Sequence, residues 1–439
     1  MGAFDGRPLR VAAFARLWGA GSVTVFGSQL TAVAVPLRIY GLTGSSAYVG
    51  LASLVGFGPM VVAALWGGAL ADVVDRRRML LVTSGGIGMT SLLMWALATA
   101  GPESMLVLVG VQQALFGANA ATSGAVVPRL VTPDLLPAAN ALQSVSVWFA
   151  GIAGPLLAGV LMPVTGAGTL FLLDAVAMCP TLWAVWRLPA LPPPASPTVR
   201  APGVMAGVRY LLRHQILLVA YLTDFAALFF GLPTSLFPQL AHQRFGDPAA
   251  GGAVAGGAVA GMLFAAISAG GVVAALVAGL YSGSRRAGCG SRRGGSGSRR
   301  AGAMMAGAAV AWGLAITGLG VVGSLPAVGS LRVAGSPRVA GALPAALVLL
   351  AVAGAALVVL GVFRKLILQA VAVDEMRGRL QGIDLAVAAG GPRLASAAHG
   401  VAGAVWGPAR AVTGGGLLVV AAMLVLLVAF PGFARYGVK

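Results

Sequence analysis

The stretch GGALADVVDRRRML, residues 67–80, closes one long apolar run and opens the next. Gly67 and Gly68 have no side chain, so the end of the first run can lie close against a neighbouring backbone. A small-residue helix end, an acidic and basic turn and a re-entering helix predict a tight loop on the cytoplasmic face of a membrane. The charged residues of this loop are Asp72, Asp75, Arg76, Arg77 and Arg78.

The composition around this loop is typical of an integral membrane protein. The 439 residues are 58% hydrophobic and 9% charged, against roughly 25% charged residues in a soluble domain. The mean hydropathy is +0.92. Apolar runs of about 20 residues are long enough to cross a bilayer, and the chain has room for about twelve. Since backbone polar groups in lipid must be satisfied within their own segment, we expect helical spans, the first of them retained rather than cleaved as a signal.

Turn residues divide the sequence into three parts. Residues 189–202 are rich in proline and cannot continue a helix, and residues 203–214 mix apolar and basic side chains as a surface amphipathic helix would. We expect a six-helix bundle over 1–188, a cytoplasmic linker over 189–214 and a second six-helix bundle over 215–439. The expected spans are 11–37, 47–72, 79–100, 104–128, 138–162, 167–188, 215–241, 249–281, 302–323, 342–370, 379–404 and 411–431.

The two halves resemble one another at corresponding places. The fifth span carries Gly151, Gly154 and Pro155, and the eleventh carries Gly390-Gly391-Pro392. The loops after the second and eighth spans both join a glycine to a pair of arginines. Because these similar stretches occur at corresponding positions of the two halves, they predict an all-α fold of two pseudo-symmetric bundles of six transmembrane helices each.

The net charge of +18 raises the question of a nucleic-acid partner. Under this topology most of the 29 Lys and Arg residues fall on one face of the membrane. That asymmetry fits the positive-inside rule and attraction to anionic lipid, so we expect a lipid bilayer and no nucleic acid as partner. It places both termini in the cytoplasm of a multi-pass protein of the inner (plasma) membrane.

Ionisable residues inside the spans are the candidates for function, because burying them in a membrane is costly. Asp224 and Arg393 lie at similar depth and are expected to pair beside a central cavity, with Asp384 nearer the cytoplasmic end of its span. Such a carboxylate could alternate between protonated and charged forms, and a purely structural ion pair is the alternative. The further candidates for lining the cavity are Gln29, Gln113, Asn119 and Phe225.

The loop at 67–80 resembles the signature of the major facilitator superfamily, G-x-L-A-D-R-x-G-R-[RK], at Gly68, Leu70, Ala71, Asp72, Arg76 and Arg77. It departs from it at Asp75, where the pattern has Gly. The resemblance implies a transporter whose two halves rock against each other. Asp72 can then lie at the positive amino-terminal end of the helix that follows Arg377 and Arg379, and act as a gating latch. The other expected gating residues are Gly68, Asp75, Arg76, Arg77 and Arg78. A cluster of charges that merely sets orientation is the alternative.

Three further stretches resemble the siderophore (enterobactin) exporter and drug-efflux branch of that superfamily. They are DFAALFFGLPTSLFPQLA at 224–241, FRKLILQAVAVDEMRGRLQG at 363–382 and AAGGPRL at 388–394. In the fifth span the sequence is also similar to the antiporter signature of exporters, in which proline bends a helix and glycines allow close packing. The residues of that exporter helix motif are Gly151, Gly154, Pro155 and Gly159.

Other classes of protein fit less well. The histidines His214, His242 and His399 form no metal-spaced cluster, and no phosphate-binding Gly-x-x-x-x-Gly-Lys-[Ser/Thr] occurs. A channel would not need two copies with breakable latches, and a membrane enzyme would need a polar catalytic constellation. We therefore expect a monomeric exporter without cofactor or metal that moves a siderophore-like molecule or hydrophobic drug by alternating access, coupled to protons. A broad-specificity multidrug or macrolide pump is the alternative.

Overall fold

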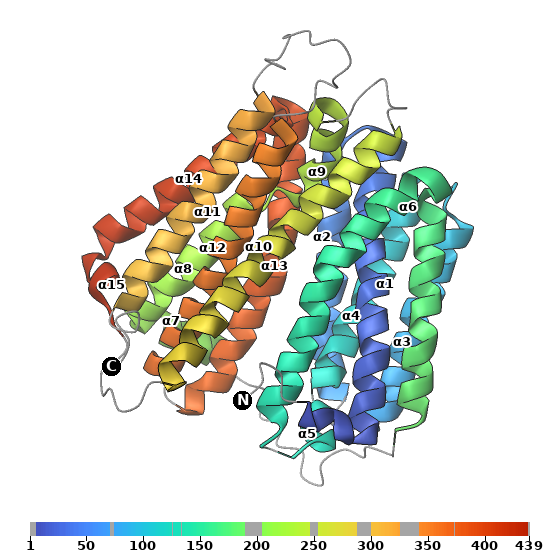
Figure 1. Ribbon diagram of the computed structural model, residues 1–439, viewed down its shortest axis with the longest axis horizontal. Helices are drawn as coiled ribbons and strands as arrows, with labels where there is room; N and C mark the ends of the chain where they lie inside the picture. The colour runs from blue at the N-terminus through green and yellow to red at the C-terminus, as the bar shows by residue number, and fades with distance from the viewer. Residues whose placement is uncertain are drawn as a thin grey trace. The chain divides into compact units, whose positions relative to one another are not determined.

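The computed structural model describes residues 6–70, 74–124, 126–132, 134–188, 204–245, 253–287, 300–324, 342–372 and 374–437, and all secondary structure in these ranges is helical (Figure 1). Ten helical segments of this part of the chain are long and apolar enough to cross a membrane. One of them holds two of the expected spans, and the expected eleventh span forms a further helix, Asp374–Trp406. The expectation of an all-helical membrane fold is confirmed.

The helices follow the expected spans closely. They are α1 Ala12–Thr43, α2 Ser46–Leu70, α3 Arg76–Ala96, α4 Pro102–Gly124, α5 Val127–Leu130, α6 Leu136–Trp186, α7 Val204–Arg213, α8 Gln215–Gly231, α9 Phe237–Leu240, α10 Ala253–Ala287, α11 Ala301–Ser324, α12 Ala342–Val371, α13 Asp374–Trp406, α14 Pro408–Ala429 and α15 Pro431–Arg435, with short helical turns at Arg7–Arg10, Thr234–Leu236 and Ala241–Phe245.

The fifth and sixth expected spans are joined within α6 without a loop. Gly166 has φ +80° and ψ 166°, a backbone conformation that side-chain-bearing residues rarely adopt. Before it, Ser146 contacts Ser22 of α1 and Gly154 lies against Gln29, so that segment runs parallel to α1. After it, Asp174 and Thr181 contact Thr31 and Thr24, so the order is reversed. Gly166 is therefore the turn between two antiparallel spans (Figure 1).

The seventh expected span is interrupted. The sequence pattern predicts one helix over 215–241, but α8 ends at Gly231 and short turns and α9 continue the segment. Pro233 has no backbone N–H to donate to the preceding turn, and its ring clashes with a helical carbonyl. The indole Nε1–H of Trp312 donates to the carbonyl of Ala227, 3.1 Å away, and joins α11 to α8 near this helix end.

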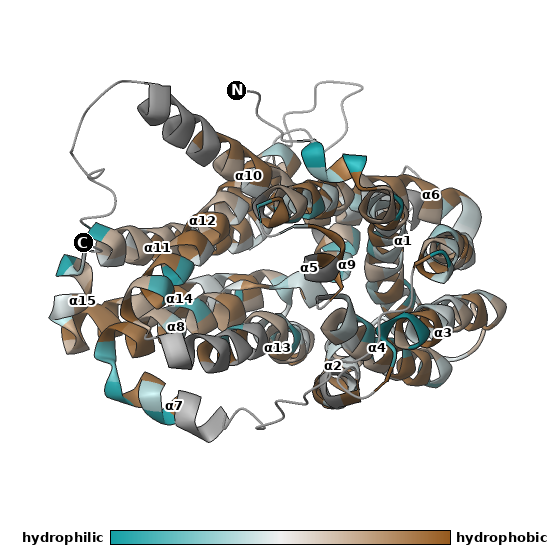
Figure 2. Ribbon diagram, turned by 90° about the horizontal axis from the view of Figure 1, so that it is seen from below, coloured by the Kyte–Doolittle hydropathy of each residue, from teal (hydrophilic) through white to brown (hydrophobic). Residues whose placement is uncertain are grey.

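The expected amphipathic helix is present as α7. Leu211 is buried while Leu212 and Arg213 are exposed, and Figure 2 shows that α7 mixes hydrophilic and hydrophobic residues. The hydroxyl of Tyr210 donates to the carbonyl of Val371 at 3.1 Å and joins α7 to the end of α12. The chain thus has a surface helix immediately before α8.

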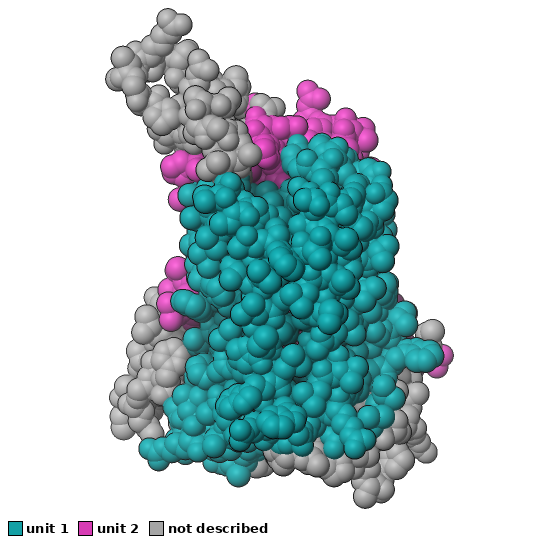
Figure 3. Space-filling model, turned by 90° about the vertical axis from the view of Figure 1, so that its right-hand side faces the viewer, with its two compact units in different colours: residues 1–199, 249–265 teal, residues 200–248, 266–439 magenta. Residues whose placement is uncertain are grey.

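The chain forms two compact units, coloured separately in Figure 3. Unit 1 comprises residues 1–199 and 249–265, and unit 2 comprises residues 200–248 and 266–439. The first part of α10 therefore belongs to unit 1 and its remainder to unit 2. Our expected boundaries at 188 and 215 remain a sequence-based proposal.

Helices within each unit approach one another through glycine. In unit 1, a Cβ placed on Gly117 of α4 would lie 2.2 Å from the carbonyl oxygen of Met60 in α2. In unit 2, a Cβ on Gly270 of α10 would lie 1.8 Å from the carbonyl oxygen of Ala351, and one on Gly354 of α12 would lie 1.9 Å from that of Ile267. Backbone-to-backbone contacts of this kind are the packing mode of helices in lipid.

Large apolar side chains cover the outside of the helices. Trp66, Val82, Val164 and Val428 expose 73–83% of their surface. Exposure of this extent would be a liability in water but is the normal state of a side chain that faces lipid. It supports the membrane-spanning interpretation of the long helices.

Candidate functional site

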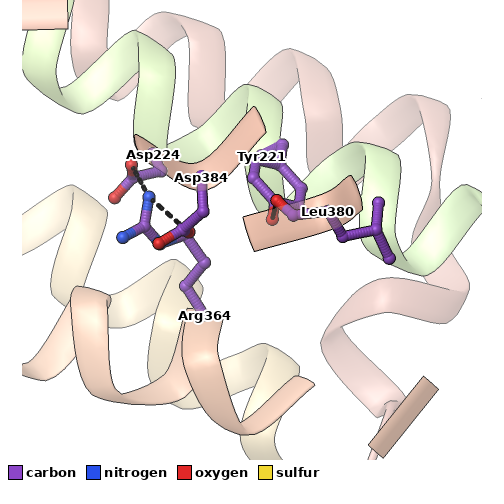
Figure 4. A network of polar contacts seen from close by, with 5 residues as sticks. All are labelled: Tyr221, Asp224, Arg364, Leu380 and Asp384. Carbon is purple, nitrogen blue, oxygen red and sulfur yellow. Dashed lines mark hydrogen bonds and ion pairs between the residues drawn. The ribbon is translucent and has the colours of Figure 1, made fainter. Parts of the chain in front are cut away.

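Three ionisable side chains from different helices of unit 2 meet in its interior (Figure 4). Nη1 of Arg364, from α12, lies 2.6 Å from Oδ2 of Asp224 in α8 and 3.2 Å from Oδ1 of Asp384 in α13. The exposed fractions of these side chains are 7% for Arg364, 4% for Asp224 and 18% for Asp384. We call these three residues the charged triad.

The charged triad contains one more acid than base. With both carboxylates ionised its net charge is −1, and with one proton on either acid it is zero. Buried charge that is not compensated is costly, and the single arginine can balance only one ionised acid at a time.

Tyr221 fixes the surroundings of the charged triad. Its hydroxyl donates to the carbonyl of Leu380 at 3.1 Å and ties α8 to α13 one turn before Asp384 (Figure 4). This bond spans the two helices that carry the acids. The acids are therefore held at a set separation by neighbouring contacts as well as by Arg364.

The expected pairing of Asp224 with Arg393 is wrong. The structure pairs Asp224 with Arg364, and Nη1 of Arg393 donates to the carbonyl of Ala389 in its own helix at 2.9 Å. Arg364 and Lys365 lie within the expected span 342–370, but neither is among the candidates chosen from the sequence. The position of Arg364 within its span could have identified it as a buried cation, since the helix continues well past Arg364 to Val371.

The other expected lining residues contact side chains of their own or neighbouring helices. Phe225 stacks on Phe229 in α8, with ring centroids 5.4 Å apart, and Phe229 meets Phe230 edge to face. In unit 1, Nδ2 of Asn119 donates to the hydroxyls of Thr83 at 2.8 Å and Ser84 at 2.9 Å, and so joins α4 to α3.

The two glutamines face glycines of neighbouring helices. A Cβ on Gly154 of α6 would lie 2.6 Å from Cβ of Gln29 in α1. A Cβ on Gly56 of α2 would lie 2.8 Å from Cγ of Gln113 in α4. Both glutamine side chains are half-buried within unit 1.

The exporter helix motif packs α6 on two sides. All four of its residues are buried, and α6 continues as a helix through Pro155. Gly154 faces α1, whereas Gly159 faces α10, where a Cβ on Gly159 would lie 3.0 Å from the carbonyl oxygen of Gly257. A Cβ on Gly261 of α10 would lie 2.4 Å from the carbonyl oxygen of Pro155. The motif, which also includes Gly151, is therefore a site of close helix packing in unit 1.

The signature loop is described in part. A Cβ on Gly67 would lie 2.7 Å from Cα of Ala118, which bears out the expected close approach of this helix end to a neighbouring backbone. Asp75, which stands where the family pattern has Gly, is the N-cap of α3: its Oδ1 accepts from the backbone N–H of Arg77 at 2.8 Å. Nη2 of Arg77 in turn donates to the carbonyl of Trp186.

The structure describes only some of the other expected gating residues. Arg76 is buried and Arg78 is exposed. Asp72 lies outside the described residues, as do Ala71 and Val73, and Gly68 is described only as part of α2. The backbones of Arg377 and Arg379 belong to the first turns of α13, and their side chains lie outside the described part of the chain.

Within the described ranges, no three His, Cys, Asp or Glu side chains come together as ligands of a metal ion would. The chemistry that the charged triad offers is proton binding and charge compensation.

The amino-acid sequence matches a model of the transmembrane secretion effector family over residues 4–284, more than half of the chain. The chain belongs to this family. Transmembrane secretion effectors are members of the major facilitator superfamily, so the expected superfamily is confirmed.

Curated relatives of this transmembrane secretion effector are named as enterobactin exporters. The protein EntS of Citrobacter koseri is 28% identical over 427 residues, with 94% of this chain and 91% of that protein covered. EntS of Shigella boydii serotype 18 has the same identity and coverage. EntS of Shigella dysenteriae serotype 1 is 30% identical over 286 residues, covering 63% and 65%.

Solved structures of other transporters share the fold. The nucleoside transporter NupG has a TM-score of 0.70 at 13% sequence identity, with 97% of this chain and 99% of that chain covered. A bacterial homologue of the iron transporter ferroportin in an inward-facing state has a TM-score of 0.65 at 12% identity, covering 98% and 99%. At these identities the likeness concerns the fold alone.

These findings establish the coarse function of this transmembrane secretion effector. It is a multi-pass membrane protein and a transporter of a small molecule, and its family and relatives are transporters rather than enzymes.

Proposed function

We propose that this chain exports a siderophore-like molecule or a hydrophobic drug across the cytoplasmic membrane, by alternating access and in exchange for protons. The observation that carries the direction of transport is the similarity to enterobactin exporters over 94% of the chain. The proposal includes a monomer in the inner membrane with both termini in the cytoplasm, supported by the distribution of Lys and Arg along the sequence.

The charged triad is the proposed coupling element. When a proton joins the triad, Asp224 or Asp384 becomes neutral and the other acid compensates Arg364, 2.6–3.2 Å away. When the proton leaves, the site gains a charge in a buried position, which a different helix arrangement with access to water would stabilise. A site whose charge changes in this way can link proton movement to a conformational change.

The signature loop is the proposed gate. Asp75 caps α3 and Arg77 donates to the carbonyl of Trp186, so the carboxyl-terminal end of the loop is tied to α3 and α6. Asp72 would then reach the amino-terminal end of α13, beside Arg377 and Arg379, when the transporter is closed to the cytoplasm. This latch rests on the resemblance of the loop to the superfamily signature and on the favourable position of an acid at a helix amino terminus.

A broad-specificity drug pump is the second candidate. Phe225, Phe229 and Phe230 form a half-buried aromatic cluster on α8. Aromatic walls with few polar anchors accept many flat, apolar ligands, whereas a catecholate site would need more hydrogen-bond partners.

Efflux into inverted vesicles tests both candidates. Vesicles containing the protein are given a proton gradient, acidic inside, and offered enterobactin, macrolides and cationic dyes in parallel. We expect uptake of the catecholate only when the gradient is present, and its loss in Asp224→Asn but not in Asp134→Asn, which removes an exposed acid. Uptake of dyes and macrolides without the catecholate favours the drug pump. Uptake unaffected by collapse of the gradient refutes proton coupling.

A further inference from the structure

Unit 1 buries a carboxyl group of its own, Asp174 in the second part of α6. Its exposed fraction is 1%. Its Oδ2 accepts hydrogen bonds from the hydroxyls of Thr31 in α1, at 2.8 Å, and Ser91 in α3, at 2.9 Å. Nε2 of Gln112, from α4, donates to the oxygen of Ser91 at 2.9 Å. Four helices therefore meet at this carboxyl group.

Hydroxyl groups, rather than a cation, surround Asp174. Its other oxygen, Oδ1, makes no hydrogen bond to any described residue and faces Gly27, where a Cβ would lie 3.0 Å away. None of the ionisable groups of the surrounding helices forms an ion pair with Asp174 among the described residues. Those groups are Arg16, Arg38 and Tyr40 in α1, Arg76, Arg77 and Arg78 in α3, Glu103 in α4, and Cys179 in α6.

The two sites differ in the groups that stabilise the acid. In unit 2, Arg364 balances the charge of a carboxylate. In unit 1, two neutral donors bind one oxygen, which stabilises a carboxylate only in part when water is excluded. An acid in these surroundings gains by holding a proton of its own.

Ser91 can form a hydrogen bond with either the charged or the protonated form of Asp174. Its oxygen lies 2.9 Å from Oδ2 of Asp174 and 3.1 Å from the carbonyl oxygen of Ile87, so its single hydroxyl hydrogen has two alternative acceptors. If Asp174 is charged, Ser91 donates to it. If Asp174 is protonated on Oδ2, Ser91 donates to Ile87 and its oxygen accepts from Asp174 as well as from Gln112. A serine oxygen has two lone pairs, so both sets of bonds are complete.

We propose that Asp174 and Ser91 form a reversible proton-binding site inside unit 1, separate from the charged triad of unit 2. In the binding step, one proton from the aqueous phase joins Oδ2 of Asp174 and the carboxylate becomes a carboxylic acid. The hydroxyl hydrogen of Ser91 turns from Asp174 to the carbonyl of Ile87, and no other bond changes. A part in transport rests on the proposed function, whereas proton binding itself does not.

A metal cation is a poorer occupant than a proton. A hard cation takes about six or more oxygen ligands, and here one carboxylate oxygen and two hydroxyl oxygens converge. A proton needs a single acceptor and one partner, which Asp174 and Ser91 supply.

Infrared spectroscopy of the full-length protein in lipid nanodiscs tests the proposal without any transport. The carbonyl stretch of a protonated carboxyl group is recorded as pH is raised, for wild type, Asp174→Asn and Asp134→Asn. We expect a protonated carboxyl band that disappears at high pH in wild type and in the Asp134→Asn control and is lost in Asp174→Asn. Thr31→Val should keep the band and change its frequency, since Oδ2 of the acid loses the hydrogen bond from Thr31. Ser91→Ala should shift it too.

Several results would overturn the proposal. One is a wild-type spectrum from which Asp174→Asn removes no protonated carboxyl band. Another is a band that pH does not alter while the protein stays folded. If Asp174→Asn does not fold, unshifted bands in both Thr31→Val and Ser91→Ala refute the proposal equally. Titration of the band with added sodium ions, at constant pH, should leave it unchanged; its loss would indicate a cation site instead.

The outcome is separable from that of the proposed function. If proton-driven efflux fails in vesicles while the band titrates, Asp174 binds protons in a protein that uses another energy source. If efflux is proton-driven and Asp174→Asn removes no protonated carboxyl band, the charged triad alone carries the coupling.

Discussion

Nη1 of Arg364 lies between two carboxylates, 2.6 Å from Oδ2 of Asp224 and 3.2 Å from Oδ1 of Asp384. A single nitrogen thus serves two acids that come from different helices. Either acid is sufficient to compensate the arginine, and the other is then available to exchange a proton. This relationship determines how the triad should respond to substitution.

Replacing one acid of the triad should abolish coupling but preserve the fold. In Asp224→Asn the pair of Arg364 with Asp384 remains neutral, so the site no longer needs a proton. We expect normal membrane insertion and substrate binding, with loss of the acceleration of export by a proton gradient. Asp384→Asn should behave in the same way. Efflux assays with an imposed gradient measure the effect, and gradient-driven export that persists in both variants contradicts the coupling role.

Replacing the arginine should instead destabilise unit 2. Arg364→Gln leaves two buried acids without a cation, and breaking a buried pair in this way costs about 3–5 kcal/mol. We expect a lower midpoint of thermal unfolding in detergent for this variant. The triple variant Arg364→Gln, Asp224→Asn, Asp384→Asn should regain most of the loss, since no buried charge remains. A triple variant as unstable as the single one would show that the arginine acts through packing.

Two acids of the signature loop should have separable effects. Asp75 caps α3 through the N–H of Arg77, and loss of an N-cap costs about 1 kcal/mol, so Asp75→Ala should lower stability. Asp72→Ala should slow turnover more than it weakens substrate binding, because the proposed latch is broken. Unfolding and transport measured on both variants provide the comparison. Equal transport rates for Asp72→Ala and wild type would remove Asp72 from the gate.

Close packing between α6 and α10 should make Gly261 intolerant of a methyl group. A Cβ there would lie 2.4 Å from the carbonyl oxygen of Pro155, and overpacking of this kind costs about 1–3 kcal/mol. Gly58→Ala is the matched control, since nothing lies within 4 Å of its Cβ position. We expect reduced thermal stability in Gly261→Ala alone. Similar melting behaviour of the two variants would contradict tight contact at the exporter helix motif.

The sequence was sufficient to predict most of the spans, because hydropathy acts locally, and the superfamily, because the loop at 67–80 resembles its signature. Gly166 falls between the expected fifth and sixth spans, and α7 falls within the expected linker. The pairing of charges was not predictable in the same way. Whether Asp224 meets Arg364 or Arg393 depends on the rotation and depth of α8, α12 and α13, which hydropathy does not determine.

The hydrogen bonds of Thr31 and Ser91 to Asp174 in unit 1 could not be predicted from the sequence either. Serine and threonine occur throughout membrane helices and usually bond to their own backbone, as Ser144 does to Asn140. Nothing in the residues themselves distinguishes Thr31 or Ser91 from such cases. The sequence places Asp174, as an acid, within the expected span 167–188, but does not show which side chains surround it.

The reversal at Gly166 has a practical consequence for mapping the protein in its membrane. A connection of one residue leaves no room for an inserted epitope or protease site, so such insertions would disrupt both spans of α6. A single cysteine substituted beside the turn is small enough to leave both spans intact. Thr165 is exposed beside the turn, and Thr165→Cys, in a chain whose Cys179 and Cys289 are replaced by serine, would report through impermeant maleimides which compartment this end of unit 1 meets.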